Sequence, residues 1–180
     1  MTSTPTPALP SPAVLAIYNA VPSVFWSVLH LGPLTVFCYQ YLARPWLYGI
    51  LGVSLLAYAL PRAWFRHWQL SSRRTIYRRM GVPLIGQFTQ YGSLVNKLIR
   101  RRYPQYRRAR NRQTVAGLVS SSYHMERFHV AALLFFLLCS LAAGAQGRWG
   151  WAVGLATLNI SYNLYPIWLQ QYLRLRAVSD

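Results

Sequence analysis

The basic residues of this chain are concentrated in one stretch, and this distribution constrains its fold more than any other feature. Of the 19 Lys and Arg residues, 14 lie within residues 62–112, and the whole chain of 180 residues has only 2 acidic residues. A net charge of +17 is typical of soluble domains that bind nucleic acid, but such domains are rarely 54% hydrophobic. Because the apolar residues flank the basic stretch, the sequence predicts a small integral membrane protein with one arginine-rich loop. This pattern argues against a disordered chain, a disulfide scaffold and a secreted domain.

The apolar flanks predict an all-α membrane bundle of about four transmembrane helices, in a single domain over residues 1–180. About 20 apolar residues cross a bilayer as a helix. We therefore expect four spans, at about 13–37, 46–65, 123–143 and 149–169. The first contains Pro22 and Pro33, which would bend it. The basic loop between the second and third spans covers 66–122 and is expected to contain amphipathic helical pieces, such as 93–102.

The ends of the chain and the loop predict its orientation in a cell membrane. The first 12 residues are uncharged and rich in proline, which indicates a frayed leader followed by a retained anchor rather than a cleaved signal peptide. The side of the membrane opposite the loop would carry only Arg44 and Arg148. The positive-inside rule therefore places the large loop and both termini in the cytoplasm. Aromatic residues alternate with the loop arginines, which favours anionic lipid headgroups over nucleic acid as partners.

The candidate site begins at the third span. Glu126 is the only acid besides Asp180, and His129 follows it by three residues. Residues at this spacing share a helix face, and ionisable groups at membrane depth are often functional. As an acid–base pair, the carboxylate would hold the imidazole tautomer while the imidazole takes a proton from a substrate hydroxyl. The alternative is structural: Glu126 pairs with a loop arginine, and His129 is a core histidine bonded to Glu126.

The fourth predicted span carries a polar stripe. Asn159 and Asn163 are four residues apart, and Pro166 and Gln170 continue the same stripe. These side chains either orient a substrate carbonyl or sugar hydroxyl, or hold helices together by hydrogen bonds. Pro166 also frees a carbonyl near Tyr162, which then needs a partner.

Other types of chemistry lack their motifs. The chain has no phosphate-binding glycine loop, no dinucleotide fingerprint and no nucleophile-elbow motif, and two acids exclude a pair of catalytic carboxylates in the bundle. We therefore predict no metal and no bound cofactor. Cys38 and Cys139 lie in apolar runs and are expected to be buried as small hydrophobic residues.

Two motifs resemble the glycosyl-4,4'-diaponeurosporenoate acyltransferase family, small membrane proteins of staphyloxanthin-type carotenoid synthesis. The first is E-x-x-H, at Glu126 and His129. The second is N-x-x-P-I-x-x-Q-x-Y-x-R-x-R at the end of the last span, read here as Asn163, Pro166, Ile167, Gln170, Tyr172, Arg174 and Arg176. The resemblance covers roughly residues 64–176. The chain departs from the family pattern at Gln171 and Leu173, and it has Asn-Leu-Tyr-Pro where the family often has Asn-Leu-Pro-Cys.

The resemblance implies transfer of a fatty acyl group to a sugar hydroxyl of a carotenoid glycoside or similar glycolipid. His129 would deprotonate the hydroxyl, Glu126 would orient His129, and Asn163 would steady the acyl oxyanion. The residues expected to bind substrate are Asn159, Gln170, Arg174 and Arg176. The acyl donor would be acyl-CoA or an acyl carrier protein bound by the loop arginines. Two rival functions remain open: a small scaffold for a larger membrane enzyme, and a subunit that binds lipid or pigment.

Overall fold

The computed structural model describes residues 9–107 and 112–179, and the chain is helical in these ranges, with no strand. Its longest helices are α1 (Pro12–Tyr41) and α7 (Arg112–Ala145). A third long helix is formed by α8 (Trp149–Asn159), the π turn η2 (Ile160–Leu164) and α9 (Tyr165–Ser179). The all-α prediction is confirmed. Residues 1–8 of the predicted leader, Arg108 and Arg110 of the basic loop, and Asp180 lie outside the described residues.

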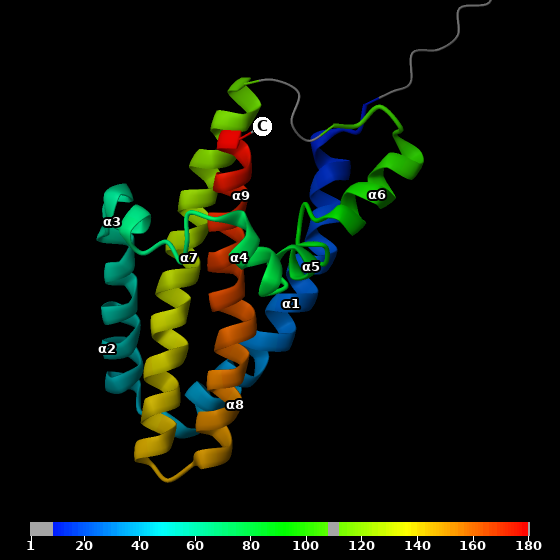
Figure 1. The fold of residues 1–180 in the computed structure, drawn as a ribbon. Coiled ribbons are helices and arrows are strands. Elements are labelled where there is room, and N and C mark those ends of the chain that lie inside the picture. The colour runs from blue at the N-terminus through cyan, green and yellow to red at the C-terminus, as the bar shows by residue number, and fades with distance from the viewer. Residues whose placement is uncertain (1–8, 108–111, 180) are drawn as a thin grey trace, which may run out of the picture.

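The bundle is built around the hairpin of α7 and the last long helix, which run side by side in opposite directions (Figure 1). The turn between them uses Gly147 at a φ of 71°, a left-handed conformation that costs glycine nothing. Helix α2 (Arg44–Leu55) packs against α7 on one side, while α1 crosses α8 on the other. Helix α1 starts where the Ser11 side chain caps the amide of Val14, with a proline in the first turn.

Two of the four predicted spans are single helices that are long and apolar enough to cross a membrane: α1, and residues 116–145 of α7. The segment predicted as the second span is divided into α2, the 3₁₀ turn η1 (Leu56–Ala59) and α3 (Arg62–His67). The segment predicted as the fourth falls in α8, η2 and α9 and contains the π turn. Helix α1 exposes a row of apolar side chains, a surface suited to lipid tails: Ile17, Val21, Val24, Phe25 and Val28.

The basic segment folds back over the last helix instead of forming an open loop. Its short helices are α4 (Arg74–Arg79), α5 (Val82–Gly86) and α6 (Ser93–Arg102), and both α4 and α5 pack against α9. Tyr77 and Val82 are fully buried beside Leu169 and Tyr172. The predicted amphipathic piece is confirmed as α6, which buries Val95 and Ile99 and ends in three arginines.

The apolar core where α1, α7 and α8 meet contains both cysteines. Cys38 and Cys139 are reduced and buried, and their sulfur atoms lie 3.8 Å apart. Phe37 and Phe136 are fully buried in the same cluster. The prediction that the cysteines are buried among apolar residues is therefore confirmed.

Candidate functional site

A π turn sets which residues of the last helix face the bundle. Pro166 has no amide proton, and in a regular helix its ring would collide with the carbonyl four residues back. The preceding turn is widened instead, so that the amide of Tyr165 donates to the carbonyl of Ile160, five residues back. At about 100° per residue, positions 155 and 171 of a regular helix would be about 160° apart. One extra residue in the turn reduces this to about 60°, and a single buried row results: Leu155, Asn159, Asn163, Ile167 and Gln171.

The two asparagines of this row form a hydrogen-bonded relay that ends at His129. The carbonyl of Leu133 accepts from Asn159 Nδ2 at 3.0 Å, and Asn159 Oδ1 accepts from Asn163 Nδ2 at 2.8 Å. This leaves Asn163 Oδ1, which lies 3.4 Å from Nδ1 of His129. Because a carbonyl only accepts, the order of donors is fixed along the relay, and Nδ1 of the neutral imidazole carries the proton. Nε2 is then the basic nitrogen.

The π turn also places an aromatic ring beside the same imidazole. The Tyr162 ring lies edge-on to the imidazole, with centroids 6.0 Å apart. The proline, the π turn and the histidine thus form one local arrangement.

Glu126 belongs to a different set of contacts. It is fully buried; Oε1 accepts from Gln171 Nε2 at 2.8 Å, and Oε2 lies 2.5 Å from Nη2 of Arg174. The other arm of the guanidinium donates to Ser122 Oγ at 3.0 Å, and its carbon lies 4.2 Å from the centre of the Tyr123 ring. The alternative that Glu126 pairs with an arginine is thus confirmed, although the arginine comes from α9 and not from the loop.

Gln171 connects this ion pair to the basic segment. Its Oε1 accepts from the amide of Leu70 at 3.1 Å and lies 3.1 Å from the hydroxyl of Tyr77, which is also 3.0 Å from the carbonyl of Ser71. Burial raises the pKa of the Tyr77 hydroxyl, which keeps it protonated and able to donate. Sequence reasoning missed Gln171 because a regular helix puts Gln170 on the stripe. The π turn moves the buried position to Gln171, and only Pro166 indicated in the sequence that the helix was irregular.

A cavity of about 1070 Å³ lies between α1, the segment from α5 to α6, α7 and the end of the last helix. Four of the predicted site residues are on its wall: His129, Gln170, Arg174 and Arg176. Its volume is at the upper end of the range for small-molecule sites. The wall also contains four polar residues of α1 and η2 that were not predicted as site residues: Ser23, Ser27, Ser161 and Tyr162.

Glu126, Asn159 and Asn163 are buried behind this wall, and their contacts differ from the expected ones. Asn163, the predicted oxyanion partner, is fully buried, and its amide group donates to Asn159. Glu126 contacts Gln171 and Arg174 and not His129, whose imidazole is held by Asn163. A shared helix face did not predict these partners, because they come from the neighbouring last helix. Asn159, predicted to bind substrate, anchors the relay.

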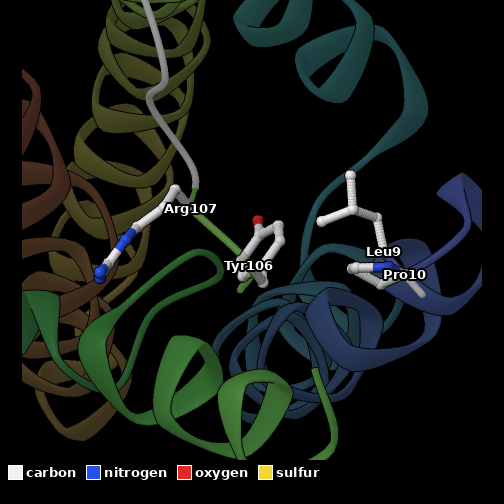
Figure 2. Close-up of a pocket in the computed structure, with 4 residues that line it drawn as sticks. All are labelled: Leu9, Pro10, Tyr106 and Arg107. Atoms are coloured by element: carbon white, nitrogen blue, oxygen red, sulfur yellow. The ribbon is translucent and has the colours of Figure 1, made fainter. Parts of the chain in front are cut away.

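A second hollow, of about 150 Å³, lies near the start of α1 (Figure 2). Leu9 and Pro10 line one side of it, and Tyr106 and Arg107 the other; the guanidinium of Arg107 extends away from Leu9. It has no acid–base pair on its wall, and the larger cavity with His129 is therefore the candidate site.

The fold and the cavity define a small helical protein with a large cavity, lined by His129 and by apolar and polar side chains of several helices. A family model described as glycosyl-4,4'-diaponeurosporenoate acyltransferase matches residues 61–179, about two thirds of the chain, and the protein belongs to this family. The match includes α3 to α9 and therefore Glu126, His129 and the last helix, whereas α1 and α2 precede it. No curated protein and no solved structure matches the chain.

Proposed function

We propose that this protein is a membrane acyltransferase that moves a fatty acyl group onto a sugar hydroxyl of a carotenoid glycoside or a similar glycolipid. The observation that carries the proposal is the position of His129 on the cavity wall, with its tautomer set by the buried relay through Asn163 and Asn159. Family membership supports the same reaction class.

In this mechanism His129 is the general base. Nε2 takes the proton from the sugar hydroxyl, and the sugar oxygen attacks the carbonyl carbon of the acyl group. The bond from that carbon to the leaving group of the donor then breaks. Such a base contributes roughly 10²–10⁴-fold to the rate. Asn163 and Asn159 act through His129, as positioning residues that hold the tautomer. Gln170 and Arg176 on the same wall would bind sugar or phosphate oxygens.

The cavity and the outer surface support an amphiphilic substrate. The wall combines apolar side chains with hydroxyl, amide and guanidinium groups, a mixture suited to a ligand with an apolar tail and a polar head. The donor would be an acyl-CoA or an acyl carrier protein, bound through the arginines at the end of α6. We further propose a multi-pass location in the cell membrane, with four spans and with the basic segment and both termini on the cytoplasmic side.

Two observations favour a second candidate, a subunit that binds lipid or pigment or acts as a scaffold without chemistry. The carboxylate of Glu126 is occupied by Gln171 and Arg174, and α1 exposes an apolar face that another membrane protein could cover. In that case the cavity would hold a ligand and His129 would be structural.

The test is acylation of the pigment in cells that make the glycoside and express either the wild-type chain or a variant. We expect His129→Ala to lower acylated glycoside by at least a hundredfold while the protein level in the membrane is unchanged. The matched control is His124→Ala, because His124 lies outside the cavity with its ring against Tyr58; it should acylate normally. Full acylation by His129→Ala would remove the base from the mechanism and favour the binding subunit.

A further inference from the structure

A serine and a histidine meet where α1 touches the π turn. Oγ of Ser161 lies 2.9 Å from Nε2 of His30, although the two residues are 131 positions apart in the chain. His30 is buried, with its ring stacked on Tyr162 at a centroid distance of 4.8 Å and an interplanar angle of 17°. The imidazole is therefore held in a fixed orientation relative to the serine.

The tautomer of His30 makes Nε2 a base. Nδ1 lies 2.9 Å from the main-chain carbonyl of Trp26, and a carbonyl only accepts, so Nδ1 of the neutral ring carries the proton. Nε2 then accepts, and the hydroxyl of Ser161 is the donor. The same hydroxyl also lies 3.0 Å from the carbonyl of Leu158 and 3.4 Å from that of Thr157, so three acceptors surround its proton, and Nε2 of His30 is the nearest. A nucleophile, a base and a group that orients the base are the three parts of an activated serine.

Ser161 has access to a ligand. Ser161 lines the large cavity and is exposed. His30, which would act as its base, is a buried residue of α1. The hydroxyl projects from η2, and π turns occur frequently at functional sites. His129 lines the same cavity, and the ring of Tyr162 contacts both imidazoles. His30 precedes the part of the chain that the family model matches.

We propose that Ser161 and His30 form a nucleophile–base pair that carries the acyl group as a Ser161 ester between donor and acceptor. This inference rests on the proposed function and divides its reaction into two half-reactions. In the first, a bond forms between Ser161 Oγ and the acyl carbon of a thioester or other activated ester, and the bond to the leaving group breaks. The serine proton passes to Nε2 of His30 and from there to the leaving group.

The second half-reaction uses the other imidazole. His129 takes the proton of the sugar hydroxyl, the sugar oxygen bonds to the acyl carbon, and the bond from that carbon to Ser161 Oγ breaks. The proton held by His129 passes to the departing Ser161 oxygen, since both residues line the same cavity, and the enzyme is regenerated. Each histidine thus serves one half-reaction, and the acyl group stays in the cavity throughout.

The experiment uses the full-length purified protein in detergent and an alkyl fluorophosphonate, a probe that phosphonylates activated serines with loss of fluoride. We expect one adduct, mapped to Ser161 by peptide mass spectrometry. Ser161→Ala should give none, and His30→Gln should label at least tenfold more slowly. The matched control is Ser54→Ala, because this serine donates to the Ile50 carbonyl within its own helix and is not among the residues that line the cavity; it should label as the wild type does.

A second measurement keeps the test valid if His30→Gln does not fold. With the p-nitrophenyl ester of a fatty acid, the wild type should release a burst of nitrophenol equal to the enzyme concentration, and Ser161→Ala should release no burst. Labelling elsewhere, no labelling of the wild type, or a full burst in Ser161→Ala overturns the pair.

The outcomes separate this inference from the proposed function. His129→Ala should still form the Ser161 adduct and show the burst, but should not acylate the glycoside. Normal pigment acylation by Ser161→Ala, together with loss in His129→Ala, would overturn the pair and leave the proposed function intact. An adduct on Ser161 in a wild-type protein that never acylates the glycoside would retain the pair and refute the proposed acceptor.

Discussion

Replacing Glu126 by leucine removes the counter-charge of Arg174. The side chain of Glu126 is fully buried and that of Arg174 is 9% exposed, so the lone guanidinium would remain in a site built for a pair. Removing one partner of a buried pair costs about 3–5 kcal/mol of the free energy of unfolding. Arg174 lies on the cavity wall and keeps its contacts with Ser122 and Tyr123, which favours the lower end. We expect a loss of about 3 kcal/mol.

The second substitution tests the cause of this loss. If the loss comes from an uncompensated charge, Glu126→Leu combined with Arg174→Met should recover stability to within about 1 kcal/mol of the wild type, because apolar residues often replace a buried pair without cost. The control combines Glu126→Leu with Arg176→Met, since Arg176 is exposed two positions further along the same helix. It should be as unstable as the single variant.

The assay is reversible unfolding of the purified proteins in mixed micelles, followed by far-ultraviolet circular dichroism. A loss below about 1 kcal/mol for Glu126→Leu, or equal recovery with Arg174→Met and Arg176→Met, would refute the view that this pair is a specific buried contact.

Three further outcomes are expected from single substitutions. Asn163→Ala should lower pigment acylation by about 10–100-fold without loss of membrane protein, because the tautomer of the catalytic base is no longer held. The cell-based assay measures the acylation, and a thermal-unfolding scan measures the stability of the variant. Gln171→Leu should destabilise the protein by roughly 1–3 kcal/mol, since it leaves buried donors unpaired, and limited proteolysis should cut the basic segment sooner. Gly92→Ala should also destabilise it, because an added Cβ would lie 2.4–2.7 Å from three main-chain carbonyls, whereas Gly117→Ala has open space and should not.

The sequence singled out residues that the structure places at or behind the cavity wall, but it did not predict their contacts. The scarcity of acids made Glu126 conspicuous, and the spacing to His129 placed both on one helix in the buried part of the bundle. Their partners could not be predicted, because they come from another helix. The contact between Asn163 and His129 depends on how α7 packs against the last helix, and residue spacing within one helix does not predict that packing.

The register of the last helix shows why sequence periodicity failed locally. A fixed period of 3.6 residues puts Asn163 and Gln170 on one stripe, and it held as far as Asn163. Beyond Pro166 the widened turn brings Gln171 to the interior and leaves Gln170 on the cavity wall. His30 and Ser161 were missed for a related reason, since 131 positions separate them and only the crossing of α1 over the turn brings them together.

The widened turn also marks a point where the helix absorbs one residue of extra length. Loss of a single residue within 160–164, with the turn closing to a regular helix, would leave Gln171 and Arg174 facing the carboxylate, because the turn already offsets the phase by that one residue. The Pro166 ring would then meet the carbonyl four residues back. Related sequences that lack the extra residue are therefore expected to lack the proline as well.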